Sequence, residues 1–198
     1  MTTNSISSAP KTIHKQPNWR NVIAACAAIT VFGFPLGLTY PLLSLILEDR
    51  GVSSELIGLN GAMMPLGILL FSVVIPKVTH RFGGRNVAIG AALVTALTIL
   101  AYKQFDTLSA WFLIRLVQGM SISVLFVLSE AWIVGFSGDQ HRGKIVAIYG
   151  TILSASFGIG PLIISIIGID GWLPFILGAI IVIVGIIPLL FIQLDKPA

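Results

Sequence analysis

Arg115 and Glu130 are the two ionisable residues within one long apolar stretch, Leu108–Phe136. A guanidinium can bind an anion, and a carboxylate can carry a proton, so residues of these types inside a membrane helix are candidates for solute or ion handling. In a helix the two groups would lie about 22 Å apart along the axis. They cannot pair with each other, so each needs another polar partner or water.

Polar and small residues accompany Arg115 at helical spacing. Gln118 and Gly119 follow one turn later, and Ser121 and Ser123 come next. This track favours a helix face that looks onto a bundle interior or an aqueous cavity. The alternative is that Arg115 lies in the outer third of its helix and extends its guanidinium to the lipid headgroups. We prefer the interior position.

Glu130 lies toward the other end of the same stretch. We interpret it first as a member of a structural ion pair, with Arg81, Arg85 or Arg142 as the partner. Such a pair between helix ends could also serve as a gate latch, and the two interpretations are compatible.

The composition places these residues in a membrane. The chain is 56% hydrophobic and 10% charged, whereas about 25% of residues are charged in soluble domains. Its long apolar runs match the thickness of a bilayer and lack the alternation of barrel strands, so they must be helices. The expected fold is an all-α, multi-pass integral membrane protein. The expected transmembrane helices are Val22–Leu47, Leu56–Val78, Asn86–Tyr102, Leu108–Phe136, Ile145–Ile169 and Trp172–Ile192.

The polar, Ser- and Thr-rich residues 1–20 are expected to form a disordered cytoplasmic tail. Residues 21–194 form the six-helix unit, and residues 195–198 are the start of a cytoplasmic loop or the chain end. Most basic residues fall on the side of the N-terminus, which predicts that both termini are cytoplasmic. These residues are Lys11, Lys15, Arg20, Lys77, Arg81, Arg85, Arg142, Lys144 and Lys196. Because this bias accounts for the net charge of +4, no nucleic-acid partner is expected.

Glycine and proline interrupt the same helices that hold polar side chains. They are Gly33, Pro35, Gly37 and Pro41 in the first helix, Pro65 in the second, and Gly158, Gly160 and Pro161 in the fifth. Packing alone accounts for many such residues. Their coincidence with Thr39, Tyr40, Asn60 and Ser154 nevertheless indicates a cavity near the bilayer midplane that these four residues line.

Enzyme chemistry has little support in the sequence. Cys26 is the single cysteine, and His14, His80 and His141 show no ligand spacing, so neither a disulfide nor a metal site is expected. No Ser/His or paired-acid constellation is present, and no cofactor is expected.

Three motifs occur in order along the chain: Pro76-Lys77-Val78-Thr79-His80-Arg81-Phe82-Gly83-Gly84-Arg85 after the second helix, Arg115-Leu116-Val117-Gln118-Gly119 in the fourth, and Gly158-Ile159-Gly160-Pro161 in the fifth. They resemble signatures of the N-terminal six-helix half of a major facilitator superfamily transporter, a resemblance that covers roughly Arg20 to Lys196.

The first motif resembles the family's cytoplasmic Gly-x-Leu-x-Asp-Arg-x-Gly-Arg-Arg/Lys loop. Arg81, Gly83 and Arg85 match, while Pro76, His80 and Gly84 replace a glycine, the aspartate and a basic residue. Glu130, followed by Arg142-Gly143, resembles the groups that close a cytoplasmic charge network with this loop. The resemblance therefore implies a gate network of Arg81, Gly83, Arg85, Glu130 and Arg142.

The second motif is similar to the family's Arg-x-x-Gln-Gly signature, and it implies that Arg115, Gln118 and Gly119 handle substrate or protons. The third resembles the glycine–proline signature of exporters that exchange substrate for protons, with Gly158, Gly160 and Pro161 forming a bend. Ile164 and Ser165 stand where that signature has a second glycine pair.

The resemblance implies secondary active transport of a small solute by alternating access, with proton-coupled export across a plasma membrane, the inner membrane in a bacterium. The implied partners are membrane lipid, the solute, protons and a second six-helix half, either a missing C-terminal half or another chain. An arginine turned to lipid would cost about 2.5–3.5 kcal/mol even on the lower insertion scales, which is why a partner face is expected. The alternative is a non-transporting membrane scaffold or assembly subunit.

Overall fold

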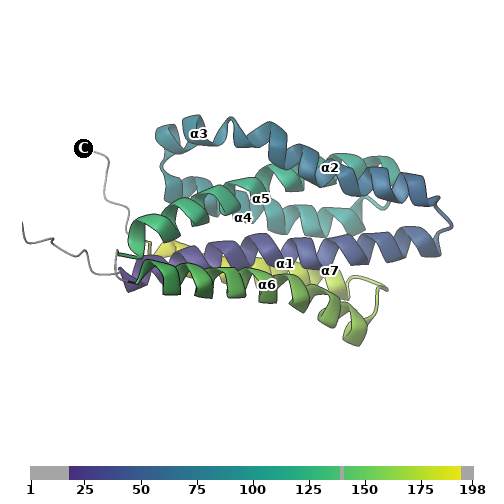
Figure 1. The fold of residues 1–198 in the computed structure, drawn as a ribbon. Coiled ribbons are helices and arrows are strands. Elements are labelled where there is room, and N and C mark those ends of the chain that lie inside the picture. Colours follow the sequence, from purple (N-terminus) through teal and green to yellow (C-terminus); the bar gives the residue numbers. More distant parts are fainter. Residues whose placement is uncertain (1–17, 139–140, 193–198) are drawn as a thin grey trace, which may run out of the picture.

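The computed structural model describes residues 18–138 and 141–192, and helices are the only regular elements within these ranges (Figure 1). The helices are α1 (Trp19–Asp49), α2 (Ser54–Ser72), α3 (Ile75–Phe82), α4 (Gly84–Gln104), α5 (Leu108–Phe136), α6 (Arg142–Ile167) and α7 (Leu173–Leu190). Six of them, all but α3, are long and apolar enough to cross a membrane. The expected all-α fold with six transmembrane helices is confirmed.

The first helix starts earlier than expected, because a capping residue precedes it. The Asn18 side chain accepts a hydrogen bond from the backbone N–H of Asn21 over 3.4 Å, which satisfies one of the free N–H groups at the helix start. Trp19 and Arg20, which the sequence placed in the tail, therefore belong to α1. Residues 1–17 of that expected tail, and the segment 195–198, lie outside the described residues.

The second expected helix, Leu56–Val78, is wrong at its C-terminal end. The structure divides it into α2, which ends at Ser72, and the short helix α3, which begins at Ile75. Pro76 explains the division, because proline lacks an N–H group and fits the first turn of a helix better than its interior. Only Gly83, with a φ of 79°, separates α3 from α4, so residues 79–85, expected between the second and third helices, are largely helical.

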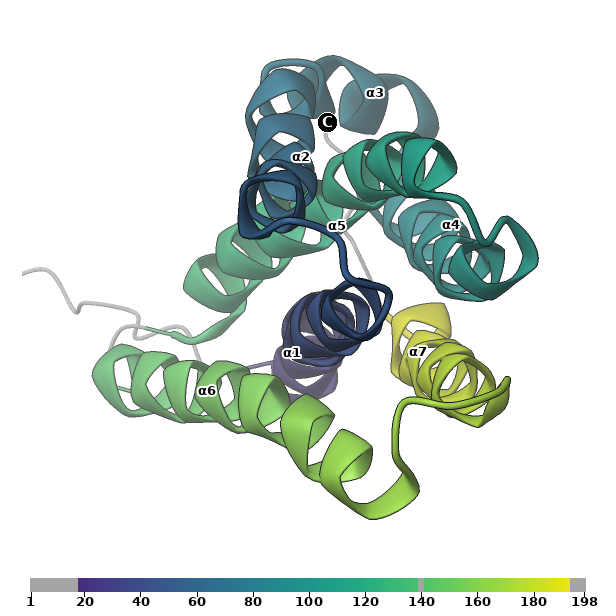
Figure 2. The ribbon, with the colours of Figure 1, turned by 90° about the vertical axis from the view of Figure 1, so that its right-hand side faces the viewer.

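The six spanning helices form two groups of three with matching contacts. α1 packs against α5, α6 and α7, while α5 packs against α1, α2 and α4, and α4 packs against α7 (Figure 2). The first group is α1, α2 and α4, and the second is α5, α6 and α7. If each helix is replaced by the helix at the same place in the other group, the same set of contacts results. Because successive spans alternate in direction, the two groups run in opposite senses, as in the inverted repeats found in many membrane proteins.

Close glycine contacts occur at equivalent places in the two groups. A Cβ added to Gly119 of α5 would collide with the carbonyl oxygen of Met64 in α2, and a Cβ added to Gly37 of α1 would collide with the carbonyl oxygen of Phe157 in α6. The facing glycines Gly67 and Gly160 each lie three residues after these carbonyls and are equally crowded. Backbone therefore meets backbone at both crossings, which only glycine permits.

Candidate functional site

Arg115 lies inside the helix bundle, with only 1% of its surface exposed. Its Nη2 atom donates a hydrogen bond to the carbonyl oxygen of Thr39 in α1 over 3.3 Å. Its guanidinium carbon lies 4.8 Å from the centre of the Tyr40 ring, a favourable cation–π distance. The interior position preferred from the sequence is confirmed, and extension of the side chain to the headgroups is not what the structure shows.

The charge on Arg115 has no carboxylate beside it. Its Nε and Nη1 atoms are buried and have no hydrogen-bond partner, and the one ion pair within residues 18–138 and 141–192 joins Arg50 to Asp106. A buried cation without a partner is costly. The N–H groups on Nε and Nη1 of Arg115 are therefore open to an acceptor that the described part of the chain does not supply.

Tyr40 connects Arg115 to α2. Its hydroxyl donates to the carbonyl oxygen of Gly61 over 3.2 Å. Pro65 lies four residues after Gly61 and cannot donate to this carbonyl, so the helix leaves it free for Tyr40. The neighbouring residue, Asn60, is completely buried, and neither polar atom of its side chain has a partner.

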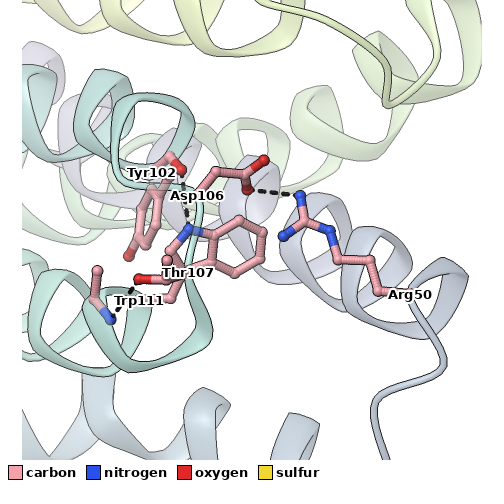
Figure 3. Close-up of polar contacts among 6 residues, drawn as sticks. Arg50, Tyr102, Asp106, Thr107 and Trp111 are labelled. Carbon is pink, nitrogen blue, oxygen red and sulfur yellow. Dashed lines mark hydrogen bonds and ion pairs between the residues drawn. The ribbon is translucent and has the colours of Figure 1, made fainter.

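Gln118 lies one turn beyond Arg115 and is also completely buried. Its Oε1 atom accepts a hydrogen bond from the Tyr102 hydroxyl over 2.8 Å, whereas its Nε2 atom has no partner. The Tyr102 carbonyl in turn accepts a hydrogen bond from Trp111 Nε1 over 2.9 Å (Figure 3). Tyr102 was not predicted as a site residue. The sequence feature that could have indicated Tyr102 is a phenol at the end of an apolar helix, because a buried hydroxyl there must find a hydrogen-bond partner.

We refer to six of these residues together as the polar cluster. They are Thr39, Tyr40, Asn60, Tyr102, Arg115 and Gln118. Four helices contribute to it: α1, α2, α4 and α5. The cluster combines one permanent cation with unpaired donors on Arg115 and Gln118 and an unpaired amide on Asn60, so it can bind a polar or anionic group.

Other predicted site residues are not members of the polar cluster. Gly119 lies at the crossing of α5 with α2, and Gly160 at the crossing of α6 with α1. Ser154 is exposed on α6, where its hydroxyl donates to the Gly150 carbonyl over 3.1 Å. Gly158 and Pro161 are exposed on the same helix, and α6 is continuous from Arg142 to Ile167.

The predicted gate network lies at the end of the bundle that holds α3. Arg81, Gly83, Arg85, Glu130 and Arg142 are all exposed. Within the part of the chain that the structure describes, Glu130 forms no ion pair with an arginine, so the expected pair is absent. The physical reason is that an exposed pair contributes only about 0–1 kcal/mol and does not hold these side chains together. Their role in gating stays a prediction.

The opposite end of the bundle holds a contact that the sequence did not predict. Arg50, at the end of α1, forms an ion pair with Asp106 over 2.6 Å and lies 5.1 Å from the centre of the Trp111 ring (Figure 3). These residues border a polar pocket of about 120 Å³ that Asp49, Lys103 and Asp170 also line. The pocket brings together all three connections at this end.

Comparison with known proteins gives a consistent family match. A family model described as the Major Facilitator Superfamily matches residues 17–198. An MFS-type transporter of Bacillus subtilis, YfkF, is 26% identical over 85% of this chain and 43% of its own length. An MFS-type transporter of Enterobacter sp. strain 638 is 22% identical over 88% of this chain and 46% of its own. A transporter of Schizosaccharomyces pombe, SPAC750.02c, is 27% identical over 82% of this chain and 34% of its own. The chain thus spans less than half the length of these relatives.

Proposed function

The chain belongs to the Major Facilitator Superfamily, and from this membership we propose that it forms the N-terminal half of a carrier for a small solute. The carrier works by alternating access, in which two six-helix halves rock around a central site, and it exports its solute in exchange for protons. The curated relatives are transporters by name, which favours transport over catalysis. The membrane is the plasma membrane, the inner membrane in a bacterium.

The observation that carries this proposal is the buried Arg115 with two unpaired nitrogen atoms. A cation in the oily part of a membrane is retained where it performs a function or meets a partner. Arg115 and Gln118 contact the solute or take part in charge coupling, and Gly119 allows α2 to approach them. Thr39, Tyr40 and Asn60 line the same cavity.

The second half of the carrier is either the continuation of this polypeptide or another chain. The greater length of the relatives supports this part of the proposal. Ser154, which is exposed on α6, lines the completed cavity, and Gly158, Gly160 and Pro161 let α6 bend. Arg81, Arg85, Glu130 and Arg142 form ion pairs with each other or with the second half when the cytoplasmic side closes, and Gly83 makes the turn between α3 and α4 that positions the two loop arginines.

Solute-driven proton movement tests this proposal. Proteoliposomes that hold the chain with its complementary six-helix half are loaded with a pH-sensitive dye, and a panel of small organic solutes is added. We expect some solutes to change the internal pH with the unmodified chain, and Arg115→Gln to abolish the response. Arg20→Gln, which removes an exposed guanidinium at the start of α1, is the matched control. An unchanged response in Arg115→Gln would remove this residue from the mechanism. No response to any solute with the unmodified chain would favour the scaffold alternative.

A further inference from the structure

An apolar groove lies on the surface of the bundle, and none of the polar-cluster residues lines it. It has a volume of about 420 Å³ and is bordered by α2 and α3 on one side and by α4 on the other, with α5 as its floor. Phe71, Phe82, Val94 and Val124 are among its lining residues, and the polar ones are Asn86 and Ser121. Figure 1 shows α2 and α3 along one edge of the molecule, with α4 and α5 beneath them.

Cationic residues follow the rim of this groove at one end. Val78 and Phe82 of α3 line the groove, and their helix also carries the exposed residues Lys77 and Arg81. The Arg81 guanidinium carbon lies 5.3 Å from the centre of the Phe82 ring, so the cation lies directly beside the lining. On the other side of the groove, the exposed Arg85 immediately precedes the lining residue Asn86.

No acidic residue pairs with these cations within the described residues, and Glu130, at the same end of the bundle, forms no ion pair with them. The sequence contains neither aspartate nor glutamate between Leu56 and Phe105. None of Lys77, Arg81 and Arg85 forms an ion pair within the described residues. An apolar slot with unneutralised cations at one end is complementary to a molecule that has an apolar tail and an anionic head.

We propose that the groove between α2–α3 and α4 binds an acyl chain of an anionic phospholipid, whose phosphate lies on Arg81 and Arg85. Basic sites between transmembrane helices on the cytoplasmic side bind such headgroups, and the anionic lipids of that leaflet are close by. An apolar protein segment would fill the slot without using the cations. While the cytoplasmic side is open, these cations have no partner in the second half, so the charge favours a lipid over a second copy of the chain or a second half as the occupant.

The structure provides a way to fill the groove without disturbing the fold. Gly90 lines the groove, and a Cβ added there would meet no atom within 4 Å. Gly90→Leu therefore places a side chain into the space that the acyl chain would occupy. Gly150 of α6 is equally open and lies away from the groove, so Gly150→Leu is the matched control.

Photo-crosslinking with defined lipids tests the proposal. The purified chain is placed in nanodiscs that contain a photoreactive phosphatidylglycerol or a phosphatidylcholine with the same tails, and the labelled peptides are identified. We expect phosphatidylglycerol to label α3, α4 and α5 in preference to phosphatidylcholine. The double variant R81Q/R85Q should lower this labelling by about fivefold for each cation removed, whereas R20Q/K144Q, which also removes two exposed cations, should not.

Gly90→Leu should reduce labelling in the groove by either lipid, and Gly150→Leu should leave it unchanged. Raising the salt concentration should weaken the preference for phosphatidylglycerol in the unmodified chain, which tests the charge argument without any substitution. Equal labelling by the two lipids, no response to R81Q/R85Q, or crosslinks between two copies of the chain at this groove would overturn the proposal.

Discussion

At the scale of single residues, the polar cluster contrasts with two pairs of buried hydroxyls elsewhere in the bundle, although the Thr79 hydroxyl in α3 is also buried without a partner. Thr95 and Ser121 pair with each other over 2.9 Å, and so do Ser129 and Tyr149 over 2.8 Å. By contrast, Asn60 and parts of Arg115 and Gln118 are left unpaired. Unsatisfied buried polar atoms are rare in folded proteins, and a group of them on facing helices calls for a functional explanation.

Removing the Tyr102 hydroxyl tests the hydrogen bond that it donates to the Gln118 side chain. In Tyr102→Phe the Gln118 Oε1 atom loses its donor while remaining buried, which should lower the free energy of unfolding by about 1–3 kcal/mol. Thermal unfolding in detergent measures this effect. Thr151→Val is the control, since the Thr151 hydroxyl is exposed and bonds only within its own helix. Equal stability of the two variants would show that the Tyr102–Gln118 bond contributes nothing.

The exposed ion pair between Arg50 and Asp106 should contribute little. Both side chains are more than one third exposed, at 36% and 40%, so water and salt screen their attraction. Arg50→Gln should change the free energy of unfolding by less than about 1 kcal/mol. Thermal unfolding in detergent measures this change. A much larger loss of stability would mean that the contact of Arg50 with Trp111 is an important constraint on this end of the bundle.

At the scale of helices, the two glycine crossings determine how closely the elements pack. Gly37 and Gly119 each face a carbonyl oxygen of the neighbouring helix. At the α1–α6 crossing, Pro161 has no N–H group to donate to the Phe157 carbonyl. This carbonyl therefore has no helix hydrogen bond from Pro161, and Gly37 faces it. Close backbone packing at the α2–α5 crossing thus brings the polar side chains of α2 and α5 within reach of one another.

A methyl group at either crossing should separate the helices. Gly37→Ala and Gly119→Ala should each cost about 1–3 kcal/mol of stability or more, because the clash is with backbone and no rotamer change relieves it. Gly135→Ala, in the same helix as Gly119, places its Cβ in open space and should be tolerated. The comparison is made by the yield and thermal stability of purified protein. Tolerance of Ala at Gly37 or Gly119 would refute the tight crossing.

The helices were largely predictable from the sequence, and their contacts were not. Apolar length set five of the six spans to within three residues, but length could not reveal that Pro76 starts a separate helix. Spacing along one helix placed Arg115 and Gln118 on a common face. The pairing of Gln118 with Tyr102 depends on the relative positions of α4 and α5. The spacing of residues along one helix does not predict how two helices are placed. The expected ion pair of Glu130 is absent for a different reason, since an exposed pair adds too little free energy to hold two side chains together.

At the scale of the whole molecule, charge divides the two ends of the bundle. One end holds the basic residues Arg20, Lys77, Arg81, Arg85, Arg142 and Lys144. The other holds Arg50 and Lys103 together with the acidic residues Glu48, Asp49, Glu55, Asp106 and Asp170. Because basic residues favour the cytoplasmic side, we propose that α1 begins and α7 ends in the cytoplasm.

Thiol labelling of intact cells tests this orientation. In a Cys26→Ala background, cysteine replaces the exposed Gln104 at one end or the exposed His141 at the other. A membrane-impermeant reagent should label Gln104→Cys in intact cells, and His141→Cys only after the membrane is permeabilised. The reverse pattern would show that the bundle has the opposite orientation.

The central claim is that the polar cluster faces a water-filled solute path rather than a dry packing interface. Its most direct test is the reactivity of Asn60→Cys toward a water-soluble thiol reagent, with Cys26 replaced by alanine and the complementary six-helix half present. Leu93→Cys, which is exposed on α4 and should contact lipid, is the comparison. The account predicts that Asn60→Cys reacts and Leu93→Cys does not. An unreactive Asn60→Cys in correctly folded protein would contradict it.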